Sequence, residues 1–385
     1  MTIVGAEVLE FHRALDGASW NPSFRWRERR AALLLIGTDT GTIGVGEAWA
    51  VPSSIESVLG PLATAIAPRL IGRTLSEREA LVAEVAALPA PDVAPWATAA
   101  AASALDIALW DATARTRGEP LWRTLGGTNG RVRVYASGGL YRDGASPEDL
   151  AQEMRAEIDA GFRAVKMKIG ALPLADDLAR VRAVRNAIGA DATLWVDAVN
   201  QLGAADAAVW CAALREVGVA AIQAPLPFDD VAGMARLNRA LPVIAGEVEH
   251  RAERFAALLD AGAVAYLQFC LGLCGGFGGA ARLDRAAIAR GVATTPQCFS
   301  TAILQAASLH FGAACGNVAI VEYHRFHDHL AGLMPTAMRR VRDGFIELDA
   351  TPGLGLALPR PGPQPCGGVL ALRGAVGAPL PANPS

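Results

Sequence analysis

From Arg131 onward the chain repeats one unit, in which a short apolar run is followed by a turn and an amphipathic stretch rich in Ala, Leu and Arg. There are eight such runs, and helical patterns fill the seven gaps between them. The runs are Val132–Ala136, Ala164–Ile169, Thr193–Asp197, Ala220–Gln223, Val243–Glu247, Ala265–Cys270, Val292–Thr295 and Val318–Glu322. Strands alternating with helices predict a parallel sheet covered by helices, and eight of them predict closure. We therefore predict an α/β protein with a (β/α)7β TIM-like barrel over residues 126–350.

The chain before the barrel follows a different pattern. Residues 1–125 show apolar strands with Gly-rich turns, such as residues 37–46, followed by helical stretches. The apolar stretch Ala97–Trp110 contains Asp106 and is too short to span a membrane, so we predict a buried helix there. Residues 1–125 are thus expected to form a separate α+β domain. Prolines and glycines are dense in the C-terminal tail, residues 351–385, which we expect to pack back on that domain.

The composition excludes several classes of partner. The chain has 35 Lys and Arg residues against 38 Asp and Glu residues, a formal net charge of −3, so we predict no nucleic-acid partner. The start of the chain runs into an alternating strand pattern without a signal peptide, and we expect a cytoplasmic protein with no membrane partner. Six cysteines without a Cys-x-x-Cys pair predict reduced, mostly buried thiols.

Polar residues close most of the eight apolar runs. In a parallel barrel the chemistry lies at the C-terminal strand ends, so these side chains are expected to converge at one mouth. Lys166 and Lys168 lie two residues apart on one strand and therefore both point into the barrel. The other strand ends carry Asp197, with Asn200 after it, Gln223, Glu247, Cys270, Gln297 and Glu322. Lysines directed inward need a carboxylate or another anion to offset their charge.

Two interpretations of this set remain open. Asp197 and Glu247 pair with Lys166 and Lys168 as a buried ion cluster without catalysis. Alternatively, the carboxylates hold a hard divalent cation and the lysines serve a carboxylate substrate. Oxygen ligands suit Mg²⁺, which can stabilise an enediolate while a lysine takes the α-proton. Glu249 shares a face with Glu247 by strand alternation and is an alternative ligand if its loop turns inward.

Three histidines follow the last apolar run, at positions 324, 327 and 329. Their spacing invites a metal site, but imidazoles at these intervals do not share one helical face. We therefore predict that His324, His327 and His329 are solvated or cap loops.

Several motifs resemble those of one family. They are Ser103–Asp111 followed by Gly118–Gly127, then Val165–Lys168, Trp195–Asp197 and Ala245–Glu247. Their order, along nearly the whole chain, resembles the mandelate racemase and muconate lactonizing enzyme branch of the enolase superfamily. The resemblance implies that residues 1–125 are a capping domain, that Mg²⁺ is the cofactor, and that the substrate is a small organic acid. It places Asp197, Gln223 and Glu247 at the metal-ligand positions, and we also expect a homo-oligomer.

The resemblance also implies roles for the lysines and for two loops. Lys168 is the base of the pair, and Lys166 binds the substrate carboxylate. The loops Trp20–Trp26 and Trp49–Ser53 belong to the capping domain and are expected to close over the barrel mouth, with Trp20, Phe24 and Trp49 as an apolar lid. Ordinary packing between domains is the alternative interpretation of these aromatic residues.

The departures from the family pattern weaken the predicted site. A Glu-Glu-Pro motif is replaced by Gln223-Ala224-Pro225, so that one metal carboxylate becomes an amide. The Asp-x-Asn sequence is longer by one residue, because Asn200 follows Asp197 at the third position. Where the mandelate racemase subgroup has an Asp–His base pair, this chain has Cys270 and Gln297. An amide ligand lowers the affinity for a hard cation without excluding it.

Two functions follow as hypotheses. The first is a metal-assisted lyase or isomerase with a degraded site, a dehydratase or racemase in which Lys168 removes the α-proton of a hydroxy acid. Tyr135 or water then helps a leaving hydroxyl depart, and Cys270 is a weaker candidate acid. The alternative is a catalytically degenerate barrel that binds an organic acid or has only an assembly role.

Overall fold

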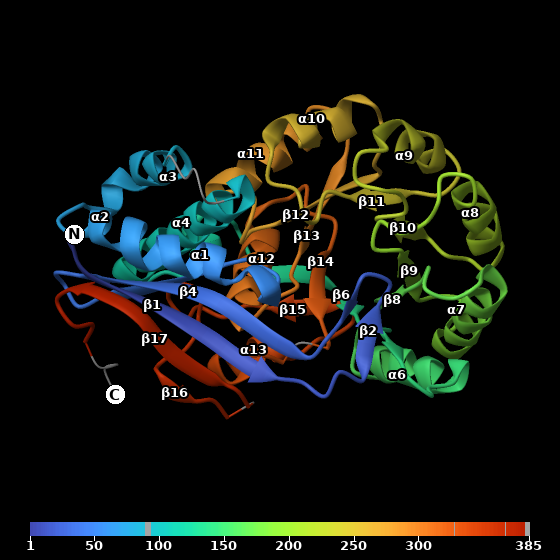
Figure 1. Ribbon diagram of the computed structural model, residues 1–385, viewed down its shortest axis with the longest axis horizontal. Coiled ribbons are helices and arrows are strands. Elements are labelled where there is room, and N and C mark those ends of the chain that lie inside the picture. The colour runs from blue at the N-terminus through green and yellow to red at the C-terminus, as the bar shows by residue number, and fades with distance from the viewer. Residues whose placement is uncertain (89–93, 327, 366, 382–385) are drawn as a thin grey trace.

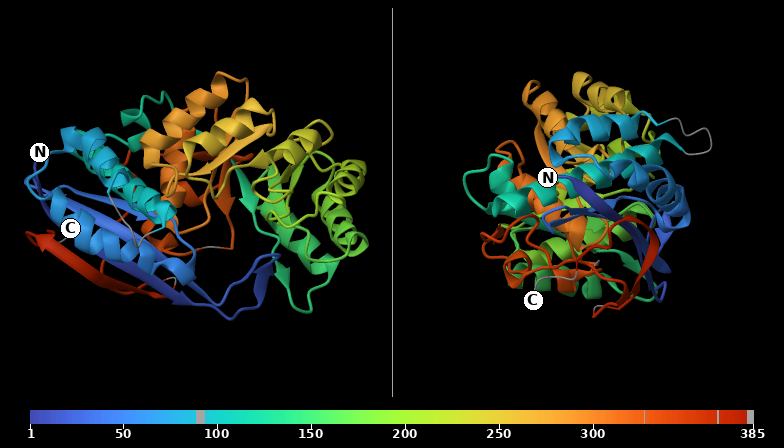
Figure 2. Two further views of the ribbon diagram at one scale, coloured as in Figure 1. Left: turned by 45° about the horizontal axis from the view of Figure 1, so that its top comes forward. Right: turned by 90° about the vertical axis from the view of Figure 1, so that its left-hand side faces the viewer.

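The computed structural model describes residues 1–88, 94–326, 328–365 and 367–381, and places an antiparallel sheet with its helices beside a parallel barrel (Figure 1). Figure 2 shows the same two parts from two further sides. The predicted (β/α)7β barrel with an N-terminal α+β capping domain is confirmed.

Eight parallel strands form the barrel. In sheet order, the path runs β13-β12-β11-β10-β9-β8-β6-β14, and a bridge between Thr294 and Val318 brings its two ends together. The strands are β6 (Arg131–Ser137), β8 (Ala164–Lys168), β9 (Thr193–Asp197), β10 (Ala221–Gln223), β11 (Val243–Ala245), β12 (Tyr266–Cys270), β13 (Ala293–Gln297) and β14 (Val321–His324). Strand β15 (Phe345–Glu347) pairs with β6 in antiparallel fashion.

Several strand ends differ from the sequence prediction, and those of β11 and β14 each differ by two residues. Strand β11 ends at Ala245 rather than at Glu247 because Gly246 adopts a φ of 114°, which breaks the extended backbone. Strand β14 runs on to His324, two residues past the predicted end. Both differences change which side chains face the barrel mouth.

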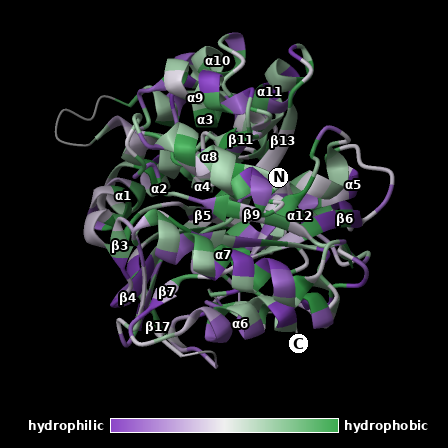
Figure 3. Cartoon of the chain, turned by 90° about the vertical axis from the view of Figure 1, so that its right-hand side faces the viewer, coloured by the Kyte–Doolittle hydropathy of each residue, from purple (hydrophilic) through white to green (hydrophobic). Residues whose placement is uncertain are grey.

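Helices cover the outside of the barrel. They are α6 (Pro147–Asp159), α7 (Leu174–Ile188), α8 (Ala207–Glu216), α9 (Val231–Asn238), α10 (Ala252–Asp260), α11 (Gly276–Ile288) and α12 (Ala302–Ala314). Ser146 caps α6 together with Asp149, and Pro147 takes the first helical position. Hydrophilic and hydrophobic segments alternate along the helices, which bury one face against the strands (Figure 3).

The second sheet has the order β16-β17-β1-β4-β5. Its strands are β1 (Ile3–Ala14), β4 (Glu28–Thr38), β5 (Ile43–Ala48), β16 (Gly362–Pro363) and β17 (Val369–Gly377). The associated helices are α1 (Glu56–Pro61), α2 (Ala67–Leu70), α3 (Arg78–Ala86), α4 (Pro95–Arg117) and α5 (Leu121–Thr124), and α13 (Thr336–Arg339) lies near the end of the barrel sequence. Strand β17 of the C-terminal tail pairs with β1 at the N-terminus, so the first and the last long strand of the described residues belong to the same sheet (Figure 1).

Small residues bring α4 close to the sheet. Eight residues of this helix are buried alanines, and it packs against β5 at Gly44 and Gly46. A Cβ atom on Gly46 would lie 2.0 Å from the carbonyl oxygen of Ala104, so only glycine fits there. Asp111 fastens the contact by accepting a hydrogen bond from the backbone N–H of Val45 at 3.0 Å. Among the helices of the described residues, none combines the length and apolar character needed to cross a membrane.

Candidate active site

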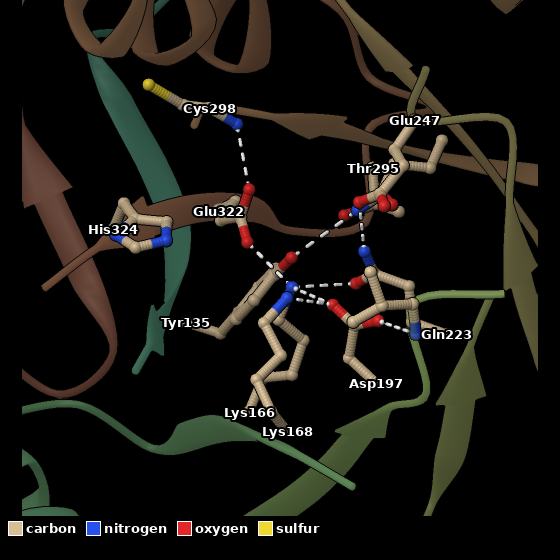
Figure 4. A network of polar contacts seen from close by, with 12 residues as sticks. Tyr135, Lys166, Lys168, Asp197, Gln223, Glu247, Thr295, Cys298, Glu322 and His324 are labelled. Atoms are coloured by element: carbon tan, nitrogen blue, oxygen red, sulfur yellow. Dashed lines mark hydrogen bonds and ion pairs between the residues drawn. The ribbon is translucent and has the colours of Figure 1, made fainter. Parts of the chain in front are cut away.

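Two lysines on one strand form the floor of the barrel mouth. Lys166 and Lys168 lie two residues apart on β8, so both side chains point inward. Figure 4 shows both ammonium groups beside the carboxylates of Asp197 and Glu322. These are the only two lysines in the sequence, against 33 arginines.

Asp197 ends β9 and accepts hydrogen bonds from both lysines. Its Oδ2 lies 3.1 Å from Nζ of Lys166 and 2.5 Å from Nζ of Lys168, and its Oδ1 accepts from the backbone N–H of Val199. Burial alone would raise the pKa of Asp197, but Lys168 and Lys166 outweigh burial and hold the pKa at about 2. Asp197 is therefore ionised at neutral pH.

Oxygen atoms from three strands surround Lys166. Besides Asp197 of β9, its Nζ donates to Oε1 of Gln223 on β10 and to Oε1 of Glu322 on β14, each at 2.8 Å. Burial would lower the pKa of Lys166, but the negative charge of Glu322 and of the other acidic groups nearby raises it well above its usual value. Lys166 is therefore a permanent ammonium ion.

The amide of Gln223 connects Lys166 to Glu247. Its oxygen faces Lys166, and its Nε2 donates a short hydrogen bond to Oε2 of Glu247. Burial, followed by the charge of Asp197, raises the pKa of Glu247 to about 7. Glu247 can therefore give up or accept a proton near neutral pH.

Glu322 and His324 lie two residues apart on one face of β14. Oε2 of Glu322 accepts from the backbone N–H of Cys298 at 2.9 Å. His324 is buried, and its ring meets that of Phe299 edge-on with centroids 4.9 Å apart. Burial, and then the charge of Lys166, lowers the pKa of His324 well below its usual value, so the ring is neutral.

The turns after β9 and β10 hold an unusual backbone conformation. Val199, Asn200 and Ala224 have φ values of 51°, 59° and 44°. This is the left-handed region of backbone conformation, which residues other than glycine adopt uncommonly. The turns are joined by a hydrogen bond of 2.7 Å from the N–H of Asn200 to the carbonyl of Ala224. Such conformations cost about 1–3 kcal/mol each and gather at functional sites.

A cavity of about 350 Å³ opens above this cluster. Its floor is polar and its cover is aromatic, which suits a small molecule with one charged end. The lining residues are Asn21, Ser23, Phe24, Trp26, Trp49, Val51, Lys166, Lys168, Val199, Asn200, Gln201, Glu247, Val248, Gln297, Phe299, Glu322 and His324. The structure thus brings Phe24, Trp49, Asn200 and Gln297 to the cavity with the charged cluster.

A hairpin from the N-terminal sheet reaches over the barrel. Strands β2 (Ser19–Asn21) and β3 (Phe24–Arg25) pair with each other, and β2 also pairs with β7 (Tyr141–Arg142) of the barrel. Trp20 does not line the cavity as predicted. Its ring stacks on Tyr141 with centroids 4.6 Å apart, and its Nε1 donates to Asp143, because the pleat turns Trp20 away from the mouth and Phe24 toward it.

Two buried charged residues, Arg29 and Glu47, position the loop that carries Phe299. Nη2 of Arg29, on β4, donates to the carbonyl of Phe299 at 2.8 Å and to Oγ of Ser300. Glu47, on β5, accepts from Oγ1 of Thr301 at 2.6 Å and from the hydroxyl of Ser300. Two strands of the N-terminal sheet therefore fix an aromatic wall of the cavity.

Two polar atoms of the cavity wall have no hydrogen-bond partner among the described residues. One is the acceptor Oε1 of Gln297 and the other is the donor Nε1 of Trp49, and both are buried. Buried polar atoms normally have a partner. A ligand that carries hydroxyl groups would supply one for each.

Three other residues predicted near the site lie outside the cavity lining. Tyr135 is fully buried beneath it, where its ring packs on Trp195 with centroids 4.9 Å apart. Cys270 is also fully buried, and burial raises the pKa of its thiol well above the usual value, which leaves it unreactive. The carboxylate of Glu249 accepts from Arg251 at 3.1 Å and does not turn inward.

The histidines differ from the sequence prediction in one case. His324 is a buried wall residue of the cavity, not a loop cap, because β14 extends to it. The signal was available, since His324 follows Glu322 at the same two-residue interval that joins the lysines. His329 is buried away from this cavity, where its ring lies 5.7 Å from that of Phe11, and His327 lies outside the described residues.

The arrangement at the predicted metal position does not fit Mg²⁺. Only two carboxylates, from Asp197 and Glu247, belong to the predicted ligand set, and Asp197 is bound by two ammonium groups. Between them, Gln223 presents an N–H donor to Glu247 and its oxygen to Lys166. The described residues include no group of three or more His, Cys, Asp or Glu side chains suited to a metal ion. Mg²⁺ needs oxygen atoms free to converge on it.

Comparison with known proteins places the sequence in a well-populated group. The family described as "Enolase C-terminal domain-like" matches residues 149–361, and the "Mandelate racemase / muconate lactonizing enzyme, N-terminal domain" matches residues 25–126. The first match covers more than half of the chain. Both halves of the fold are therefore accounted for by the two domains of one family.

Individual relatives match large parts of the chain. D-galactarolactone cycloisomerase of Agrobacterium fabrum is 30% identical over 94% of this chain and 97% of its own length. Arabinonate dehydratase of Saccharolobus solfataricus is 28% identical over 66% of this chain and 69% of its own. The structure of a racemase from Streptomyces coelicolor with bound magnesium superposes with a TM-score of 0.81, at 24% identity over 92% of this chain and 97% of that one, and supports the fold.

Proposed function

The chain belongs to the mandelate racemase and muconate lactonizing enzyme branch of the enolase superfamily, and on this premise we propose that it is an enzyme acting on a small hydroxy acid. The reaction is proton removal from the carbon next to the substrate carboxylate. Relatives include dehydratases, cycloisomerases and racemases. Among these we favour dehydration of a polyhydroxy acid.

The position of Lys168 is the observation that carries this proposal. Its side chain is 9% exposed and lines the cavity, while the structure gives its Nζ one hydrogen-bond partner, Asp197. An amine held by a single contact at the floor of a cavity is free to meet a substrate carbon. Lys168 in its unprotonated form accepts the α-proton, and the electron pair left on carbon becomes an enolate.

Glu247 supplies the second proton transfer. It faces the same cavity, and its pKa of about 7 keeps part of the population protonated at neutral pH. When the enolate expels a hydroxyl from the neighbouring carbon, Glu247 donates the proton that turns this group into water. Lys168 and Glu247 thus act as base and acid on adjacent carbons, and no step depends on a metal ion.

The wall of the cavity favours a substrate with several hydroxyl groups. Gln297 and Trp49 offer an unpartnered acceptor and donor, and Asn21, Ser23 and Asn200 add polar groups. Two relatives are named for sugar-acid chemistry, a galactarolactone cycloisomerase and an arabinonate dehydratase. We therefore propose aldonic and aldaric acids, sugar acids with one or two carboxylates, as the substrate class.

Isotope exchange tests this function. A panel of aldonic and aldaric acids is incubated with the protein in D₂O, and mass spectrometry follows both α-deuterium and loss of water. We expect wild type to do both on at least one acid. Lys168→Met should abolish both, whereas Glu247→Gln should retain exchange and lose dehydration. The proposal fails if no acid exchanges, or if exchange survives in Lys168→Met.

A further inference from the structure

We propose that the ammonium group of Lys166 is the resident cation of the barrel mouth and takes the place of a divalent metal ion. This inference rests on the proposed function, because it names the positive charge that organises the same site. In this proposal Lys166 holds the carboxylates of the site together, whereas the family resemblance suggests that Lys166 binds the substrate carboxylate.

The first argument is geometric. An ammonium group has three N–H donors, and Lys166 meets three oxygen acceptors, on Asp197, Gln223 and Glu322, at 2.8–3.1 Å. The residue is 1% exposed. These contacts use every donor of Lys166, so none is left for a substrate carboxylate.

The second argument concerns charge. The cluster contains two ammonium groups and three carboxyl groups, those of Asp197, Glu247 and Glu322 (Figure 4). Two positive charges already balance all but one of the possible negative charges. A divalent ion would leave the buried cluster with excess positive charge, which is costly in a site screened from water.

The third argument is the orientation of Gln223. Its amide oxygen is taken by Lys166 and its N–H group points at Glu247. A metal ion between Asp197 and Glu247 would face this N–H donor, which cannot act as a ligand. Turning the amide around would place its N–H group against the ammonium of Lys166 instead. The observed orientation of the Gln223 amide therefore suits the ammonium group of Lys166 and does not suit a metal ion between Asp197 and Glu247.

The fourth argument comes from composition. The chain uses arginine for 33 of its 35 basic residues and lysine only at positions 166 and 168. A planar guanidinium group cannot direct three donors from one nitrogen to three strands, whereas the compact ammonium group of lysine can. Lysine is thus confined to the place where that shape is needed.

Binding of Mg²⁺ tests the inference without any knowledge of the substrate. Titration calorimetry with MgCl₂ should give no specific heat for wild type, and MgCl₂ should raise its melting temperature no more than NaCl of equal ionic strength does. Lys166→Ala leaves an oxygen-lined gap, so Mg²⁺ should bind this variant and raise its melting temperature. Lys168→Ala is the matched control, because it removes the same charge but keeps the ammonium group of Lys166 among its three oxygen acceptors, and it should bind Mg²⁺ much more weakly than Lys166→Ala does.

A second variant covers the case in which Lys166→Ala does not fold. Gln223→Glu adds a negative charge and removes the N–H donor that faces Glu247, so it should bind Mg²⁺ at least about tenfold more tightly than wild type. The inference is overturned if wild type binds Mg²⁺ as tightly as Gln223→Glu, or if a folded Lys166→Ala gains no affinity for the ion.

The two proposals can fail separately. Magnesium binding by wild type together with Lys168-dependent exchange would remove only the inference about Lys166. An absence of exchange together with an absence of magnesium binding would remove the proposed function and leave the inference intact.

Discussion

At the scale of single residues, the site combines buried charge with backbone strain. Val199 follows the strand that ends at Asp197, and its N–H group binds the Asp197 carboxylate at 2.9 Å. It does so at a φ of 51°, which is unfavourable for a β-branched side chain. The strained turn thus fixes the carboxylate that holds both lysines, and the cost of that strain is measurable.

Replacing Val199 should expose this cost. Val199→Asn keeps a side chain but suits the left-handed conformation, so it should raise the free energy of unfolding by about 1 kcal/mol. Val199→Ala is the matched control, because it shortens the side chain without favouring that conformation. Urea unfolding followed by circular dichroism distinguishes them, and equal stabilities would show that the turn is not strained.

At the scale of elements, much of the molecule was predictable from the sequence, including Phe24 and Trp49 of the lid, but the place of Trp20 was not. Alternating apolar runs located all eight barrel strands, and the two-residue interval placed Lys166 and Lys168 on one face. The direction of the Trp20 side chain depends on the register of β2 against β7. The burial of Tyr135 depends on its depth in the barrel, and the place of His324 in the cavity wall depends on where β14 ends. These are contacts between distant segments, which a local pattern does not encode.

The packing of α4 against β5 makes a clear prediction. Gly46→Ala would drive a methyl group to 2.0 Å from the carbonyl oxygen of Ala104, so it should lower the free energy of unfolding by about 3 kcal/mol or more. Gly60→Ala is the control, because nothing lies within 4 Å of its added Cβ and it sits in helix α1. That substitution should stabilise the protein by about 0.5–1 kcal/mol. Comparable losses in both variants would contradict the packing argument.

Two buried groups at helix contacts should give opposite pH dependences. His310 of α12 accepts from the backbone N–H of Trp122 in α5 at 3.0 Å, and burial lowers its pKa from 6.5 to about 4. Since the folded state resists protonation of His310, its contribution to stability is complete above about pH 6.5 and is lost as the pH falls toward 4. His310→Asn keeps a hydrogen-bond acceptor but cannot be protonated in this pH range. The free energy of unfolding of wild type should fall by about 3 kcal/mol more than that of His310→Asn between pH 7 and pH 4, which unfolding measured as a function of pH will show.

Asp106 of α4 should show the reverse trend. It accepts from the backbone N–H of Gly278 in α11 at 3.0 Å, and burial raises its pKa from 3.8 to about 6. Its contribution is complete below about pH 4 and is lost as the pH rises through 6, because the folded state then holds a buried charge. Asp106→Asn should therefore be more stable than wild type at pH 7 and equal to it near pH 4. A variant less stable than wild type at both pH values would contradict this account.

At the scale of the whole molecule, the N-terminal sheet and the barrel build one cavity. Arg29 and Glu47 hold the Phe299 loop from one side, and the β2–β3 hairpin covers the mouth from the other. The hairpin is fastened to the barrel at Asp143, which accepts from Nη1 of Arg25 at 2.7 Å and from Nε1 of Trp20 at 3.0 Å. Because this anchor is exposed, it should govern local opening more than global stability.

Asp143→Ala tests that role of the anchor. Hydrogen–deuterium exchange should speed up in the peptide that contains residues 19–25, while the melting temperature stays within about 2 °C of wild type. Asp159→Ala is a matched control, because it also removes an exposed Arg–Asp pair, but on α6 and away from the hairpin. Unchanged exchange in residues 19–25 would show that the hairpin is held by other contacts.

The central claim is a division of labour between the only two lysines of the chain, and lysine NMR tests it most directly. Protein labelled with ¹⁵N at the lysine side chains should give two Nζ signals, assigned with Lys168→Met. Saturation with a hydroxy acid that exchanges its α-proton should shift the Lys168 signal and leave the Lys166 signal in place, because only Lys168 meets the substrate. A ligand-induced shift confined to Lys166 would contradict the account.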